Sequence, residues 1–192
     1  MITDVQAVFC TLSCPILCSN AYICVHKTST SNTMAHTEQD MKLMRRAIEL
    51  ATESVRNGGG PFGAVIARNG RIVAEASNSV TLDTDPTAHA EVNAIRTACR
   101  ELGTFDLSGH TIYTSCEPCP MCLGAIYWAH LDAIYYGNNR QDAADIGFDD
   151  DFIYKEIEKP MAQRSTPIRQ LLQAEALSSF IEWRDKADKT EY

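Results

Sequence analysis

The sequence predicts an α/β fold in which helices alternate with the strands of a partly parallel sheet. Apolar residues recur at helical spacing before residue 57, a hairpin signal follows near residue 70, and short strand-like segments then alternate with helical ones up to residue 137. This alternation favours a parallel segment, because the intervening helix carries the chain back to the same end of the sheet. The 192 residues, 45% of them hydrophobic, are enough for one compact domain with a buried core.

The first expected element is a helix that begins at Thr37 and ends near Asn57. The tetrad at residues 37–40 (TEQD) resembles a capping box with Asp in place of Glu, which is a helix start signal. The glycines at 58–60 should end the helix. Its apolar residues recur three or four positions apart, at Met41, Met44, Ile48, Ala51 and Val55.

Two strands joined by a tight turn are expected next, over residues 62–68 and 71–77. The turn residues Asn69 and Gly70 both tolerate positive φ, as a two-residue hairpin turn requires. This is the strongest hairpin signal in the chain.

A second helix should begin near Thr87, after the break at Asp85-Pro86, and run to Gly103. Residues 111–115 then predict a short β-branched strand. A third helix through Trp128 and a further strand over residues 133–137 complete the alternating pattern.

Beyond residue 137 the periodic pattern weakens. Residues 139–151 are polar and end in an acidic run at 149–151, and an apolar helix is expected over residues 177–186. At the other end, residues 1–36 form an expected leader, rich in Ser, Thr and Cys, that is too broken to serve as a signal peptide or a membrane span. We expect Met34 to be the natural start, with one domain over residues 37–192; the four leader cysteines leave a metal-binding leader as an alternative.

A candidate zinc site comes from one histidine and two cysteines. His89 lies thirty positions before Cys119, and Cys122 follows Cys119 after a gap of two residues, which lets one turn of backbone present both sulfurs. Catalytic zinc sites use three protein ligands and keep one position for water, whereas structural sites use four. The nearby carboxylate of Glu91 therefore favours a catalytic site.

A closed structural site remains the alternative to this interpretation. Cys116 supplies a third cysteine, so that Cys116, Cys119, Cys122 and His89 would make a Cys₃His set. The proline directly before Cys119 and the glutamate two residues after His89 favour the open site.

Zinc lowers the pKa of its bound water from 15.7 to roughly 7, which makes hydroxide available at neutral pH. Glu91 is close enough in sequence to the ligand His89 to accept the proton of this water and to deliver it to a ring nitrogen and a departing amine. The residues together predict hydrolytic deamination.

The pattern H-x-E followed by P-C-x-x-C is that of the zinc nucleobase deaminases, and the chain resembles the cytidine deaminase superfamily, in particular its guanine deaminase branch. The resemblance covers residues 38–192. The segments that carry it are GGPFGAV (59–65), DPTAHAE (85–91), SCEPCPMCLGA (115–125), GFDD (147–150), FIYKEI (152–157) and the final Glu191-Tyr192.

This resemblance implies a cytidine-deaminase-like fold, a three-layer α/β/α sandwich around a five-stranded mixed sheet. It also implies one zinc ion per subunit and a homodimer in which the C-terminal segment is exchanged, so that Tyr192 closes the partner's active site. The implied reaction converts guanine to xanthine and ammonia, as part of purine catabolism. Tyr192 could equally be frayed, as chain ends usually are.

The resemblance further implies contacts to the purine from Asn78 and Asp150, in addition to Tyr192. Phe62 and Trp128 are candidate aromatic contacts to the purine, and Ala90 is a candidate backbone donor. The carboxylate at Asp150 would accept two hydrogen bonds from the amidine-like edge of guanine, and the backbone N–H of Ala90 would donate one. Each has a simpler interpretation: Asn78 as a turn residue, Asp150 as part of a solvated acidic run, and the two aromatic residues as core.

Composition limits the substrate class. The net charge of −8 and the lack of a basic stripe near the motifs disfavour a polynucleotide substrate. Thiolate ligands need a reducing compartment, which favours the cytoplasm, and no membrane association is expected. Guanosine deaminase, tRNA adenosine deaminase and a non-catalytic zinc module remain as alternatives.

Overall fold

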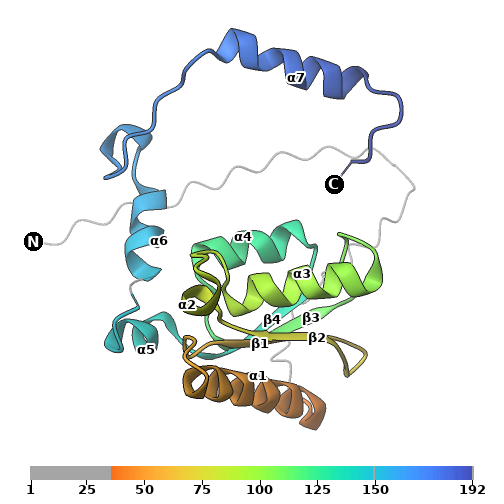
Figure 1. Ribbon diagram of the computed structural model, residues 1–192, viewed down its shortest axis with the longest axis vertical. Coiled ribbons are helices and arrows are strands. Elements are labelled where there is room, and N and C mark those ends of the chain that lie inside the picture. Colours follow the sequence, from red (N-terminus) through yellow and green to blue (C-terminus); the bar gives the residue numbers. More distant parts are fainter. Residues whose placement is uncertain (1–35, 149, 192) are drawn as a thin grey trace, which may run out of the picture. The chain divides into compact units, whose positions relative to one another are not determined.

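The computed structural model describes residues 36–148 and 150–191. The expectations for the leader up to residue 35, including a start at Met34, and for Tyr192 lie outside the described residues. A β-sheet lies between α1 (Glu38–Arg56) on one face and α3 (Ala90–Leu102) with α4 (Pro120–Trp128) on the other (Figure 1). The predicted three-layer α/β/α arrangement is confirmed.

The sheet is mixed and has the strand order β2 (Arg71–Ser77), β1 (Gly63–Arg68), β3 (Thr111–Cys116), β4 (Ala133–Asn138). Strand β1 pairs antiparallel with β2 and β3, and β3 pairs parallel with β4. The expected parallel segment is therefore the β3–α4–β4 unit.

The expectation of a fifth strand is wrong for the part of the chain that the structure describes, where the sheet has four. After β4 the chain turns helical, because the Asn139 side chain accepts the backbone N–H groups of Gln141 and Asp142 and so starts a helix. The elements that follow are α5 (Arg140–Asp145), α6 (Asp150–Glu158), the 3₁₀ turn Met161–Gln163 and α7 (Gln173–Asp185). Helix α7 lies where an apolar helix was expected, and no helix in the described ranges is both long and apolar enough to cross a membrane.

Helix α1 covers one face of the sheet. Its capping box is formed as predicted, since the Thr37 hydroxyl accepts the N–H of Asp40 and the Asp40 carboxylate accepts the N–H of Thr37. The buried side of the helix packs on the sheet, with Leu43, Ala47 and Leu50 in one cluster with Val65, Ala67 and Tyr113.

The opposite face carries α3 and α4. Three alanines of α3 (Ala90, Ala94, Ala98) pack on the sheet, and all are fully buried. Because an alanine side chain is one methyl group, it lets the helix axis approach the strands closely. The start of α3 thereby lies close to β3, where Glu91 contacts Thr114, and the predicted ligand His89 directly precedes this helix.

The predicted hairpin between β1 and β2 is confirmed: Asn69 and Gly70 have φ angles of +50° and +74°, as the tight turn requires. A short helix that the sequence did not indicate, α2 (Val80–Asp83), lies between β2 and α3. Helix α3 begins three residues later than expected, because His89 takes the cap position.

Candidate active site

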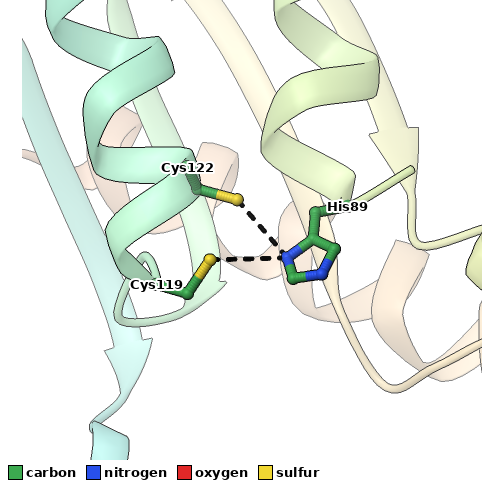
Figure 2. Close-up of side chains that lie close together, drawn as sticks. All are labelled: His89, Cys119 and Cys122. Carbon is green, nitrogen blue, oxygen red and sulfur yellow. Dashed lines mark hydrogen bonds between the residues drawn. The ribbon is translucent and has the colours of Figure 1, made fainter. Parts of the chain in front are cut away.

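His89 and Cys119 each occupy the residue just before a helix, at the N-caps of α3 and α4. An N-cap side chain often accepts an N–H of its own helix, but neither does so here. Both instead face each other and Cys122, which lies in the first turn of α4 (Figure 2). The partial positive charge of the two helix N-termini favours thiolates and an anionic ligand at this point.

The ligand atoms have the separations that zinc needs. His89 Nδ1 lies 3.6 Å from Cys119 Sγ and 3.5 Å from Cys122 Sγ, and the three ligand atoms lie within 4.8 Å of one another. Zinc bonds of about 2.05 Å to nitrogen and about 2.3 Å to sulfur, at tetrahedral angles, place these atoms about 3.5 Å apart. One imidazole and two sulfurs thus fit three corners of a zinc tetrahedron.

Cys116 stands apart from this group. Its thiol faces the carbonyl oxygen of Asn139 at 3.8 Å, and burial raises its pKa to about 11. In the described part of the chain, the metal-binding group that includes His89, Cys119 and Cys122 has three members. The geometry therefore favours the open site over the closed Cys₃His alternative.

The two ligand thiols differ in acidity. The neighbouring Cys122 thiol and His89 imidazole lower the pKa of Cys119 to about 4. The same contact to Cys119 raises the pKa of Cys122. One sulfur is thus a ready anion for a cation to bind, and a coordinated metal deprotonates the second thiol as well.

Glu91 lies one residue inside α3 and is 5% exposed. Its Oε1 accepts a hydrogen bond from Thr114 Oγ1 at 3.0 Å, and its Oε2 accepts one from Cys122 Sγ at 3.4 Å. Burial raises the pKa of this carboxyl group above its ordinary value. A carboxyl group with a raised pKa is suited to accept and return protons near neutral pH.

A cavity of about 610 Å³ opens beside this cluster. It brings together residues that are far apart in the sequence and come from the loops before β1, after β2 and before α3, and from the start of α6. The predicted site residues among its lining are Phe62, Asn78, His89, Glu91, Cys119 and Asp150.

Comparison with known proteins gives the family. A family profile described as the cytidine and deoxycytidylate deaminase zinc-binding region matches residues 37–138, more than half of the chain. The chain belongs to this deaminase family. The expected zinc cofactor is confirmed by the family match together with the ligand group.

Relatives of this deaminase include a protein named guanine deaminase from Bacillus subtilis, which is 57% identical over 78% of this chain and 96% of the relative. A solved structure, described as an X-ray structure of guanine deaminase from Bacillus subtilis, has a TM-score of 0.77 and 56% identity over 79% of this chain and 98% of that one. A tRNA-specific adenosine deaminase from Bacillus subtilis is 40% identical over 52% of this chain and 62% of the relative.

Asn78 of the deaminase is buried and lines the cavity. Its Oδ1 accepts the backbone N–H groups of Gly60 and Val80, both at 3.3 Å. The side chain is therefore a turn-forming residue as well as a cavity residue. Because its oxygen is engaged by the backbone, the amide NH₂ is the end that could donate to a ligand.

Phe62 of the deaminase forms one wall of the cavity with Phe148. The two rings make an edge-to-face contact, with centroids 4.8 Å apart and an interplanar angle of 84°. Phe148 was not singled out from the sequence, although its position directly before the acidic run was a usable signal. The pair supplies an apolar surface of the size of an aromatic base.

The remaining predicted contacts lie elsewhere in the deaminase or outside its described residues. Trp128 ends α4, is 68% exposed and does not line the cavity of the described chain. Ala90 is fully buried as the first residue of α3. Tyr192 lies outside the described residues. The roles of all three stay predictions.

Two further features of the cavity, an ion pair and a position that requires glycine, were not predicted from the sequence. Glu117 lines the cavity and forms an ion pair with Arg140 at 2.9 Å, which links the cysteine loop to α5. At Gly59 an added Cβ would lie 2.5 Å from the carbonyl oxygen of Asn78, so the loop at the cavity mouth requires glycine there. Neither contact could be foreseen, because each joins residues distant in sequence.

Proposed function

We propose that this protein deaminates guanine to xanthine and ammonia. The observation that carries the proposal is the shared cavity, in which Asp150 and Asn78 face the same space as Glu91 and the metal-binding group. The relative that is 57% identical over nearly its whole length is named guanine deaminase, which supports the same substrate.

Recognition of guanine would rest on its polar edge. Guanine presents N1–H and the exocyclic amine side by side, and the carboxylate of Asp150 can accept both. The Asn78 amide NH₂ would donate to a ring acceptor, and the backbone N–H of Ala90 would add a further donor. Phe62 and Phe148 would cover the apolar faces of the ring.

Glu91 would carry the protons. His89, Cys119 and Cys122 would hold the zinc ion, which would supply a water molecule of lowered pKa at neutral pH. Glu91 would accept a proton from the water that attacks C2 of guanine and would pass that proton to a ring nitrogen. A second proton goes through Glu91 to the exocyclic amine, which leaves as ammonia while C2 becomes the carbonyl carbon of xanthine.

We also propose that the protein acts as a homodimer. Helix α4 is apolar on all sides, yet Tyr127 and Trp128 at its end are 70% and 68% exposed. An all-apolar helix is usually buried on every side. Helix α7 likewise exposes Phe180 at 74%, together with Leu177 at 41%. A second copy would cover both surfaces.

In this proposal residues 37–192 form the deaminase domain, and its C-terminal segment is exchanged between the two subunits. Tyr192 of one subunit would then close the active site of the other. The exposed apolar residues of α7 support the exchange, since they need a partner surface. Trp128, at the exposed end of α4, would contact the purine within the same assembly.

The proposed setting is guanine breakdown in the cytoplasm. The zinc ligands include two thiols, which stay reduced in that compartment. The substrate would be a free purine base and not a nucleic acid, because the chain carries a net charge of −8 and polynucleotide binding requires basic surface.

The decisive experiment is ammonia release, with product analysis, from zinc-loaded protein given guanine, guanosine, adenine, cytosine, cytidine and a tRNA in parallel. Xanthine from guanine alone supports the proposal. Xanthosine from guanosine would move the assignment to a guanosine deaminase, and inosine formation in a tRNA substrate would move it to a tRNA deaminase. Zinc-replete protein that releases no ammonia from any substrate would indicate a non-catalytic zinc module.

A further inference from the structure

Thr114 places a hydroxyl group in the apolar interior beside the active site. It lies in the central strand β3, directly opposite Ala64 of β1, and its exposed fraction is 0%. Ile112, two residues earlier on the same side of the strand, belongs to the core cluster under α3. A polar group in such a place costs free energy unless it is hydrogen-bonded, so the partners of this hydroxyl matter.

Both partners of the hydroxyl are acceptors. Thr114 Oγ1 lies 3.0 Å from Glu91 Oε1 and 3.0 Å from the carbonyl oxygen of Cys116. A hydroxyl has one proton to donate and lone pairs to accept with. It can donate to the Glu91 carboxylate, or it can accept from a protonated Glu91 and donate to the Cys116 carbonyl.

The other side-chain donor to Glu91 does not persist once metal is bound. Cys122 Sγ contacts Glu91 Oε2 at 3.4 Å, but a zinc-bound thiolate has no proton to donate. Thr114 still holds the Glu91 carboxyl group in place. Of the side chains that hydrogen-bond to Glu91 in the described chain, it is the one that does not bind the metal.

We propose that Thr114 is a positioning residue that holds the Glu91 carboxyl group in one orientation toward the cavity. The inference rests on the proposed function for its chemistry. Its geometric basis is independent of the substrate: the Thr114 hydroxyl is fully buried in the central strand and lies 3.0 Å from Glu91 Oε1. Thr114 does not line the cavity of the described chain, so its effect on substrate would come through Glu91.

The test compares Thr114→Val, which keeps the shape and removes the hydroxyl, with Thr114→Ser, which keeps the hydroxyl. Thr111→Val is the matched control, because Thr111 lies on the same strand, three residues away and on the opposite face. The zinc content, the crystal structures of the zinc-loaded proteins and the steady-state kinetics with guanine are measured for each. Thr114→Ala is a second hydroxyl-free variant if the valine protein does not fold.

We expect Thr114→Val to retain one zinc ion, to change KM by less than threefold and to lower kcat about 10- to 100-fold. Its crystal structure should show the Glu91 side chain turned away from its position in the unmodified protein. Thr114→Ser and Thr111→Val should match the unmodified protein in both respects.

Glu91 in an unchanged orientation in the hydroxyl-free variant, or a kcat within twofold of the unmodified value, would overturn the proposal. If the unmodified protein does not deaminate guanine, the proposed function fails separately. The crystallographic comparison then still decides whether Thr114 orients Glu91.

Discussion

His89 Nδ1 lies 3.5 Å from Cys122 Sγ, although 33 residues separate them in the chain. The contact joins the first turns of two helices that pack on the same face of the sheet. The start of α4 has a strong local signal, Pro120 directly after Cys119, whereas His89 occupies the cap position of α3 without a capping hydrogen bond from its side chain. The metal-binding group is therefore as rigid as the two helices that carry it.

Replacing Cys122 by Ala should abolish stoichiometric zinc binding and turnover, because the affinity of two remaining protein ligands for zinc is much lower than that of three. Cys116→Ala should keep one zinc ion per chain, since Cys116 stands outside the ligand group in the described structure. Zinc per chain after gel filtration, measured by mass spectrometry, checks both. Loss of zinc in the Cys116 variant would revive the closed Cys₃His site.

Glu91→Gln should keep zinc and lower kcat by about 10²- to 10⁴-fold, because the amide cannot accept and return a proton. Glu101→Gln is the control, since Glu101 is an exposed glutamate near the end of the same helix. Steady-state kinetics with guanine and the metal content of both variants are the measurements. An active Gln variant at position 91 would remove Glu91 from the chemistry.

Asp150→Asn should lower kcat/KM for guanine by about 10- to 1000-fold, because an amide presents a donor to the guanine edge and leaves a buried hydrogen bond unmade. Its zinc content should not change. Asp151→Asn, the next residue of α6, whose carboxylate pairs with Lys155, should behave like the unmodified protein. Equal kinetics for the two variants would place guanine recognition elsewhere.

Deletion of Glu191 and Tyr192 should lower turnover at least tenfold and leave the zinc content at one per chain. The physical reason is that an open active site admits water and no longer holds the base in place. Activity and metal content of the shortened protein are compared with those of Glu191→Gln, which keeps the tyrosine. Unchanged turnover in the shortened protein would remove Tyr192 from the mechanism.

Tyr113→Phe should destabilise the fold by about 1 kcal/mol at pH 7, through loss of one hydrogen bond. The Tyr113 hydroxyl donates to Asp40 Oδ1 at 2.6 Å and so ties β3 to the start of α1. Tyr135→Phe is a matched control on the neighbouring strand, and urea denaturation of metal-free protein is the measurement. Equal stability of the two variants would contradict the expectation.

The same pair predicts a pH dependence. Hydrogen bonds from Thr37 and then Tyr113 lower the pKa of Asp40 below its ordinary value. The stability that this hydrogen-bonded carboxylate contributes is fully present above a pH of about 3.9, the pKa of Asp in the unfolded chain. It is lost as the pH falls through the lower pKa that Asp40 has in the folded protein. The stability difference between Tyr113→Phe and the unmodified protein should therefore be constant from pH 8 to about pH 5 and shrink in stronger acid.

Much of the fold follows from local signals in the sequence. The capping box at Thr37, the Asn69-Gly70 turn and the alternation of strands with helices predict α1, the hairpin and the β3–α4–β4 unit, and the structure confirms them. Within residues 36–148 and 150–191 the sheet has four strands and not the expected five, and a second capping box, at Asn139, makes the chain helical after β4.

The metal-binding residues were also predictable, because the two short motifs H-x-E and P-C-x-x-C supply the histidine and cysteine ligands that zinc prefers. The spacing of residues along the sequence does not indicate which side chains from distant segments are in contact in the folded protein. The hydroxyl of Thr114 reaches Glu91 because small alanines let α3 approach β3, and Phe148 meets Phe62 because α5 and α6 follow the sheet edge. Sequence order is enough for local hydrogen bonds and ligand chemistry, whereas the cavity and the partners of Glu91 depend on packing between residues far apart in the chain.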